Sequence, residues 1–154
     1  MEKFNFEKHI QKIVADAQEL KDKHLDYKNI PVNYACIFAH SEEEYAELNA
    51  ETFKIGRVLK DTPSGFLFQI KPLKTVAGNL QLLKIRKPDP TRPERGDADF
   101  TIVDFETFKN IYLNKPGYKL IQKEGFVMIE LFDPKSDVRV YFSNPPLDKQ
   151  FNLV

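Results

Sequence analysis

The residues with the clearest chemical potential in this 154-residue chain are two aspartates, Asp97 and Asp99, which are two positions apart. Alternate residues of a β-strand point to one face and lie about 7 Å apart, so a strand here would place both carboxylates side by side. Such a pair could bind a hard or borderline divalent cation. One carboxylate could instead act as a general base, with its pKa raised by its neighbour. In the remaining alternative, both are solvated or pair with Arg95 or Arg139.

Other polar side chains on the expected strands could join the aspartates. Tyr34 could donate a hydrogen bond to a ligand carbonyl or fill space as an aromatic ring. Further candidates are Gln69, Gln81, Glu130, Arg139 and Tyr141. The sequence does not determine which of these side chains face the inside of the sheet. Cys36 has no adjacent base, so we expect a buried, inert thiol. The predicted ligand-binding residues are Tyr34, Asp97, Asp99, Gln69 and Arg139, with Asp97 and Asp99 as the candidate metal ligands.

Familiar catalytic and metal-binding patterns are missing from the sequence. His9 and His24 belong to the first predicted helix, and His40 immediately precedes a helix cap, so the three histidines do not form a metal set. No glycine-rich phosphate loop, Ser/His/Asp arrangement or Cys-x-x-Cys spacing is present. No catalytic residue is therefore assigned.

The elements that would position these side chains belong to a unit that occurs twice in the sequence. The candidate caps Ser41 and Asp104 are 63 positions apart, and so are the aromatics Tyr45 and Phe108. The repetition continues downstream, where residues 65–70 correspond to residues 125–130. Each unit reads as a strand, a helix and three strands. We therefore predict one α+β domain of two tandem βαβββ modules, residues 32–86 and 97–142, forming a cupped mixed sheet.

The alternation of the first strands predicts which faces are buried. Ala35 and Ile37 share one face in the first module, as Ala98 and Phe100 do in the second. These small or apolar faces should meet the helices, so Ile37 and Phe100 should be buried. The opposite faces, with Tyr34 and Cys36 in one module and Asp97 and Asp99 in the other, should look into the cup.

Three segments lie outside the repeat. Residues 1–28 contain a predicted amphipathic helix, Glu2 to His24, whose apolar stripe either packs against the repeat or mediates a homodimer. Residues 87–96 are rich in proline and are expected to be a stiff crossover, with a PxxP ligand as the alternative. Residues 143–154 are expected to be a loosely docked tail.

The composition excludes several classes of protein. Lys plus Arg and Asp plus Glu are both 23, so the net charge is zero, and no basic run stands out. We therefore expect no nucleic-acid partner. The single cysteine excludes an internal disulfide framework. No apolar stretch has bilayer length and no signal-like segment begins the chain, which favours a soluble, cytoplasmic protein without a membrane partner.

Two tandem βαβββ modules, a strand followed by an aspartate cap, and an Asp133-Pro134 turn before the final strand resemble the vicinal oxygen chelate superfamily. That superfamily includes glyoxalases, extradiol dioxygenases and bleomycin-resistance proteins. The leading helix, residues 66–72 and the proline-rich crossover are most similar to its YecM-like branch, whose members are proposed metal-binding proteins.

The resemblance implies a metal between the modules, held by one first-strand and one late-strand residue of each. Counting seven residues back from the caps gives Asp97 and Tyr34. The late-strand positions fall near Leu82 and Val140, which cannot bind a metal. The resemblance thus implies small-molecule binding in the cup with a degenerate metal site, no cofactor and at most a weakly held divalent metal. The alternatives are a metal-dependent lyase, isomerase or dioxygenase, and an assembly protein that acts through its leading helix.

Overall fold

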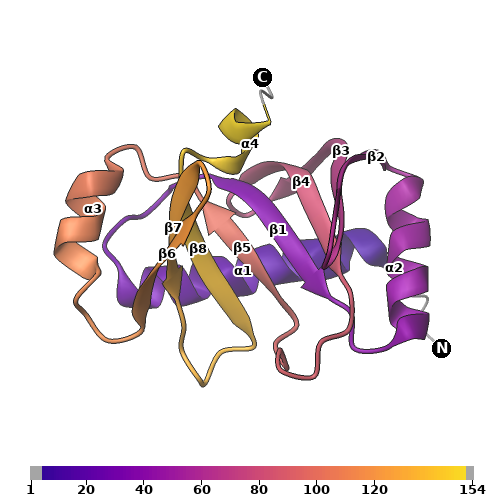
Figure 1. The fold of residues 1–154 in the computed structure, drawn as a ribbon, viewed down its shortest axis with the longest axis horizontal. Helices are drawn as coiled ribbons and strands as arrows, with labels where there is room; N and C mark the ends of the chain where they lie inside the picture. The colour runs from indigo at the N-terminus through magenta and orange to yellow at the C-terminus, as the bar shows by residue number, and fades with distance from the viewer. Residues whose placement is uncertain (1–4, 152–154) are drawn as a thin grey trace.

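The computed structural model describes residues 5–151. One curled sheet of eight strands, in the order β2-β3-β4-β1-β5-β8-β7-β6, runs through the molecule, with a helix at either end and one along its length (Figure 1). The elements in chain order are α1 (Phe6–His24), β1 (Val32–Phe38), α2 (Glu42–Phe53), β2 (Gly56–Thr62), β3 (Gly65–Thr75), β4 (Gly78–Arg86), β5 (Gly96–Phe100), α3 (Phe105–Tyr112), β6 (Tyr118–Lys123), β7 (Phe126–Leu131), β8 (Val138–Asn144) and α4 (Leu147–Gln150).

The predicted fold class is confirmed, because the two βαβββ modules have the same internal topology. The first strand of each module pairs in parallel with its last, β1 with β4 and β5 with β8. The modules meet where β1 and β5 pair antiparallel, with Tyr34 opposite Asp99 and Cys36 opposite Asp97. The repeat makes Tyr34 equivalent to Asp97 and Cys36 equivalent to Asp99. Each residue is thus paired with the equivalent of its neighbour on the other strand. This arrangement indicates a pseudo-twofold axis between β1 and β5.

The caps that revealed the repeat begin the two module helices. The hydroxyl of Ser41 accepts a hydrogen bond from the backbone N–H of Glu44 at 3.0 Å, and the Glu44 carboxylate accepts one from the N–H of His40 at 2.9 Å. This pair resembles a capping box, except that the Glu44 side chain reaches the N–H of the residue before the cap. Asp104 caps α3 by accepting from the backbone N–H of Thr107 at 3.1 Å. Helices α2 and α3 consequently start directly after the two central strands.

Helix α1 packs along the central strands, behind them in the view of Figure 1. Its apolar stripe is buried, comprising Phe6, Ile10, Ile13, Val14, Ala17 and Leu20. The stripe therefore packs against the repeat, which was one of the two predicted alternatives. It is not free to mediate a homodimer, which was the other. Asn5 caps the helix by accepting from the N–H of Lys8. The four residues before it, where the predicted helix began, lie outside the described residues.

The predicted burial of the central strands is confirmed. Ile37 and Phe100 are both 0% exposed and belong to the hydrophobic core that α1 completes. Val140 also lies in this core, opposite Ala98. The residue count that placed a late-strand ligand position at Val140 was therefore wrong, since that residue faces away from the cup.

Three segments differ from the sequence prediction. The sequence predicts a strand from Asp97 to Val103, but β5 ends at Phe100 and Val103 is fully exposed. It predicts strands from Phe66 to Lys71 and from Asn79 to Arg86, but β3 and β4 extend to a turn between Thr75 and Gly78. The expected loose tail contains the short helix α4. No helix within residues 5–151 is long and apolar enough to span a membrane.

Candidate functional site

Four of the five predicted site residues lie on adjacent central strands, and we call Tyr34, Asp97, Asp99 and Arg139 the central polar cluster. Tyr34 is on β1, the aspartates are on β5 and Arg139 is on β8, where it is the register partner of Asp97. Asp97 is 7% exposed and Asp99 is 0% exposed. The alternative in which both carboxylates are solvated is therefore wrong.

Asp99 is held by donors from two neighbouring strands. Its carboxylate accepts hydrogen bonds from Nδ2 of Asn33 at 3.1 Å, from the backbone N–H of Ser143 at 3.3 Å and from the Ser143 hydroxyl. Burial raises the pKa of Asp99 to about 7, although these hydrogen bonds act in the opposite direction. Both oxygens of Asp99 are thus already used within the protein.

Asp97 is less well satisfied. Its Oδ1 atom is buried and has no hydrogen-bond partner among the described residues. Burial, followed by the charge of Asp99, raises the pKa of Asp97 to about 7, while Lys84 and Arg86 act to lower it. A buried polar atom without a partner is rare and costs stability. Asp97 therefore presents an acceptor, or a base of near-neutral pKa, to any group that reaches it.

Neither arginine expected to neutralise the aspartates forms an ion pair with them. Arg95 turns away, placing NH1 at 3.0 Å from Nδ1 of His40 and pairing with Glu44 at 3.3 Å. Arg139 donates from Nε to Glu94 at 2.6 Å and from NH1 to Glu130 at 3.2 Å. The alternative in which these arginines pair with the aspartates is therefore wrong, because other carboxylates use the guanidinium groups.

The proline-rich crossover supplies residues that sequence reasoning missed. Glu94 is 5% exposed and ties this segment to Arg139 on β8. Arg92 interacts electrostatically with Tyr141, whose hydroxyl donates to Glu130 at 2.8 Å. The available signal was the presence of charged residues within an otherwise stiff, irregular segment.

Asn33 was also missed, and the cause is local backbone geometry. Regular alternation puts Asn33 on the same face as Ala35. The register of β1 against β5 shifts between Val32 and Tyr34, however, and the Asn33 side chain reaches Asp99 and Thr101 on the other face. A β-bulge redirects a side chain in this way and is hard to read from sequence.

Gln69 does not join the central polar cluster. It lies on β3, three strands from Asp99, which corresponds to about 14 Å. There its side chain accepts a hydrogen bond from Arg57 at 2.7 Å. Gln69 and Gln81 instead line an open cavity of about 610 Å³ near the end of α2.

Cys36 has the environment expected of an inert thiol. It is 2% exposed, and burial raises its pKa well above the usual range. The thiol group faces the carbonyl oxygen of Ile37 at 3.8 Å. A thiol needs to ionise to act as a nucleophile, so this setting disfavours such a role.

A metal site of the kind that the resemblance implies does not fit these residues. Among residues 5–151 there is no group of three or more His, Cys, Asp or Glu side chains that could hold a metal ion. Asp97 and Asp99 are neighbours, but Asp99 already accepts three hydrogen bonds. Leu82, at one late-strand position, is fully buried and has no ligating atom.

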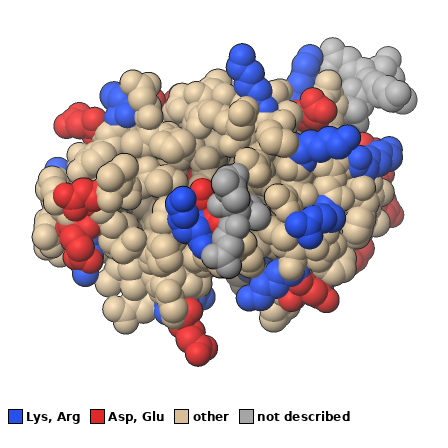
Figure 2. Space-filling view, turned by 90° about the horizontal axis from the view of Figure 1, so that it is seen from above, with Lys and Arg blue, Asp and Glu red and all other residues tan. Residues whose placement is uncertain are grey.

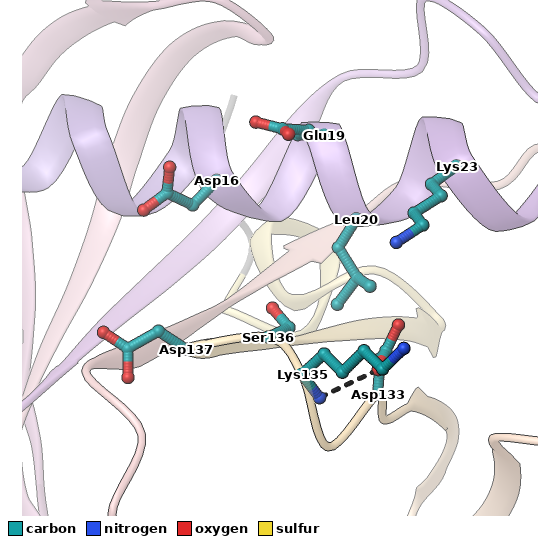
Figure 3. A pocket seen from close by; sticks show the side chains of 8 residues that line it. All are labelled: Asp16, Glu19, Leu20, Lys23, Asp133, Lys135, Ser136 and Asp137. Atoms are coloured by element: carbon teal, nitrogen blue, oxygen red, sulfur yellow. Dashed lines mark hydrogen bonds between the residues drawn. The ribbon is translucent and has the colours of Figure 1, made fainter.

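A further cavity, of about 220 Å³, lies away from the cluster between α1 and the loop before β8. Figure 3 shows Leu20 and Lys23 pointing from the helix toward the loop, with Asp133 opposite them. Asp133 is also 3.1 Å from Nε2 of His24. Four carboxylates and two lysines line this cavity, so its lining is predominantly acidic.

The surface charge is mixed. On the face above α4 shown in Figure 2, acidic and basic side chains are scattered over a largely uncharged surface, and neither kind covers it. That face therefore carries no continuous basic stripe of the type that binds a phosphate backbone.

Comparisons with known proteins give matches in structure and not in sequence. No protein-family model matches the chain, and no curated protein does. The solved structure of Protein EC4020 superposes with a TM-score of 0.69 at 14% identity, covering 99% of this chain and 97% of that one. A glyoxalase/bleomycin resistance protein/dioxygenase superfamily member from Vibrio splendidus 12B01 superposes with a TM-score of 0.51 at 7% identity, covering 74% and 97%.

The chain has the vicinal oxygen chelate fold. At these identities the likeness concerns the fold alone. Within the vicinal oxygen chelate fold, the central polar cluster occupies the paired first strands of the two modules, β1 and β5, together with β8.

Proposed function

We propose that this protein binds a polar small molecule on the concave face of its sheet, against the central polar cluster. The observation that carries the proposal is the buried Asp97 carboxyl group, whose Oδ1 atom has no partner among the described residues. A ligand that donates a hydroxyl or N–H hydrogen to Oδ1 would remove the cost of that unpaired acceptor. Arg139, held by two carboxylates next to Asp97, offers a rigid second contact.

The fold supports a binding role without identifying the ligand. We place the chain nearest to the YecM-like branch of the vicinal oxygen chelate superfamily. This placement rests on the leading helix, on residues 66–72 and on the proline-rich crossover. Helix α1 uses its apolar stripe inside the chain, so an assembly role through that stripe has no free surface to act on.

A ligand screen by two-dimensional ¹⁵N NMR tests the proposal. Small hydroxyl- and N–H-bearing compounds should include one that shifts the amides of Cys36, Asp97 and Arg139 together. Asp97→Asn should lower the affinity for that compound by about tenfold, which corresponds to the loss of one hydrogen bond to a charged group. Asp61→Asn, on the exposed edge strand β2, is the matched control and should leave binding unchanged. Binding that shifts other regions only, or that ignores Asp97→Asn, would contradict the proposal.

Proton transfer is the second candidate function, because Asp97 combines an unpartnered oxygen with a pKa raised to about 7. A carboxylate in that range can accept a proton from a bound substrate at neutral pH. The chemistry would be that of an isomerase or lyase in which Asp97 is the base. Exchange of a ligand's C–H protons with deuterated solvent, lost in Asp97→Asn, would distinguish it from binding alone.

We propose further that any divalent metal is held weakly, since only Asp97 has a free oxygen in the central polar cluster. Elemental analysis of the purified protein should find no stoichiometric zinc, because tight zinc sites use three or four protein ligands. One zinc or iron ion per chain that resists dialysis would show instead a metal-dependent enzyme.

A further inference from the structure

A separate cavity of about 110 Å³ lies at the far end of β5 from Asp97, between the start of β1 and α4. It is lined by Pro31, Val32, Asn33, Asn79, Gln81, Leu82, Thr101 and Asp148. None of these eight described residues is a lysine or arginine. The cavity has room for about three or four non-hydrogen atoms, at roughly 30 Å³ for each water-sized group.

Asn33 gives this cavity an unused acceptor. Its Nδ2 group donates to Oδ1 of Asp99 at 3.1 Å and to the hydroxyl oxygen of Thr101 at 2.9 Å, so both amide hydrogens are used. Its Oδ1 atom is buried and has no hydrogen-bond partner among residues 5–151. The residue as a whole is only 8% exposed. A donor placed in the cavity would therefore gain more than it would from an exposed amide.

The charge around the cavity selects the kind of donor. Asp148 contributes a carboxylate to the lining, and its charge acts on Asp99, the partner of Asn33. With two carboxylates nearby and no basic side chain in the lining, a positively charged donor is favoured over a neutral hydroxyl or an anion.

We propose that this cavity binds a primary ammonium group, with Asn33 Oδ1 as the hydrogen-bond acceptor and Asp148 as the counter-ion. The ligand class is thus a small amine, or a larger molecule that ends in one. This site goes beyond the proposed function, since it uses Asn33 and Asp148 and does not require Asp97.

An ¹⁵N NMR titration with methylammonium chloride tests the proposal directly. The side-chain amide of Asn33 and the backbone amides of Thr101 and Asp148 should shift together and reach saturation. Tetramethylammonium chloride at equal concentration is the matched probe, because it carries the same charge without an N–H donor, and it should not produce these shifts. Equal responses to both salts, or no saturable shift at Asn33, would overturn the proposal.

Two variants assign the effect to Asp148. Asp148→Asn removes the charge at a partly exposed helix position and should weaken methylammonium binding about threefold to tenfold. Glu106→Gln removes one carboxylate from the exposed side of α3, outside the lining of the cavity, and should leave the affinity unchanged. Unchanged binding in Asp148→Asn, with the remaining spectrum native, would contradict the assigned counter-ion.

Discussion

At the scale of single residues, the distinctive feature is a pair of carboxyl groups buried two positions apart on one strand. Asp97 and Asp99 would normally ionise near pKa 3.8, and burial raises both pKa values to about 7. The cost of holding them ionised in the fold is offset for Asp99 by Asn33 and Ser143, and far less for Asp97. The two aspartates should therefore respond differently to neutral substitution.

Asp97→Asn is expected to stabilise the protein in a pH-dependent manner. The folded pKa lies above the unfolded one, so the native state of the unsubstituted protein binds more protons than the unfolded state between about pH 4 and pH 7. The contribution of Asp97 to the stability of the unsubstituted protein is therefore fully present below the unfolded pKa. It is lost as the pH rises through about 7. At about pH 8, Asp97→Asn should raise the free energy of unfolding by roughly 1–3 kcal/mol, with little effect near pH 4.

Urea unfolding at the two pH values measures this difference. Asp99→Asn serves as the comparison, since its new NH₂ group replaces an oxygen that accepts a hydrogen bond from Ser143, and that bond is lost. It should gain less than Asp97→Asn at high pH. An Asp97→Asn protein that is equally destabilised at both pH values would show that the charge is not the source of the cost.

Ile37 and Phe100 test the opposite face of the same strands. Both side chains are fully buried against the core that includes α1. Truncation to alanine should lower the free energy of unfolding by about 2–5 kcal/mol at each position, through lost burial and the cavity left behind. Chemical denaturation provides the value, and a loss below about half a kcal/mol would show that the side chain has little packing to lose.

At the scale of elements, β5 and β1 approach each other closely under α1. A Cβ atom on Gly96 would overlap the backbone carbonyl oxygen of Cys36 and lie 3.0 Å from Cδ1 of Ile13. Gly96→Ala should therefore destabilise the protein by about 1–3 kcal/mol, because a strand or the helix must shift. Gly125→Ala, in a turn with no neighbour within 4 Å, is the comparison and should cost less despite its φ of +85°. Equal thermal midpoints for the two variants would refute the close-approach explanation.

The elements could be predicted from sequence because their signals are local and repeated. The caps at Ser41 and Asp104 and the alternation through Ile37 and Phe100 each determine an element or a face. The central polar cluster was only partly predictable. Gln69 is a polar residue on a strand, as predicted, but that strand is three strands away from Asp99. Val140 lies one position from a residue that faces the cup, so its own side chain faces the core. Glu94 comes from an irregular segment whose path no periodicity describes.

Asn33 shows a second kind of limit. Its side chain reaches Asp99 only because the register shifts between Val32 and Tyr34. A shift of one position reverses the face that a side chain occupies. Pro31 immediately precedes this point, but residues 32–34 themselves include no glycine or proline that would have signalled the shift.

At the scale of the whole molecule, the two modules are joined by a shared ladder and a shared helix. β1 and β5 pair directly, and α1 contacts β1 and β3 of the first module together with β5 and β8 of the second. Neither module can lose its structure without exposing the apolar stripe of α1. The modules should therefore unfold as one cooperative unit.

Native-state hydrogen exchange measures this cooperativity. The slowest amides of β4 and of β8 should exchange with the same free energy, equal to that of global unfolding. A free energy for β8 that lies well below that of β4 would reveal an independently opening second module. The dependence of both values on urea concentration should also converge, since both would report the same exposed surface.

The open sheet has two edge strands, β2 at one end and β6 at the other, and the outer side of each is unpaired. An exposed edge strand is a template on which a second chain can add, leading to aggregates. Both edge strands carry exposed cationic side chains, Arg57 and Lys60 on β2 and Lys119 and Lys123 on β6. Stacking of two copies edge to edge would bring like charges together, so these side chains oppose fibril growth at the places where the sheet is incomplete.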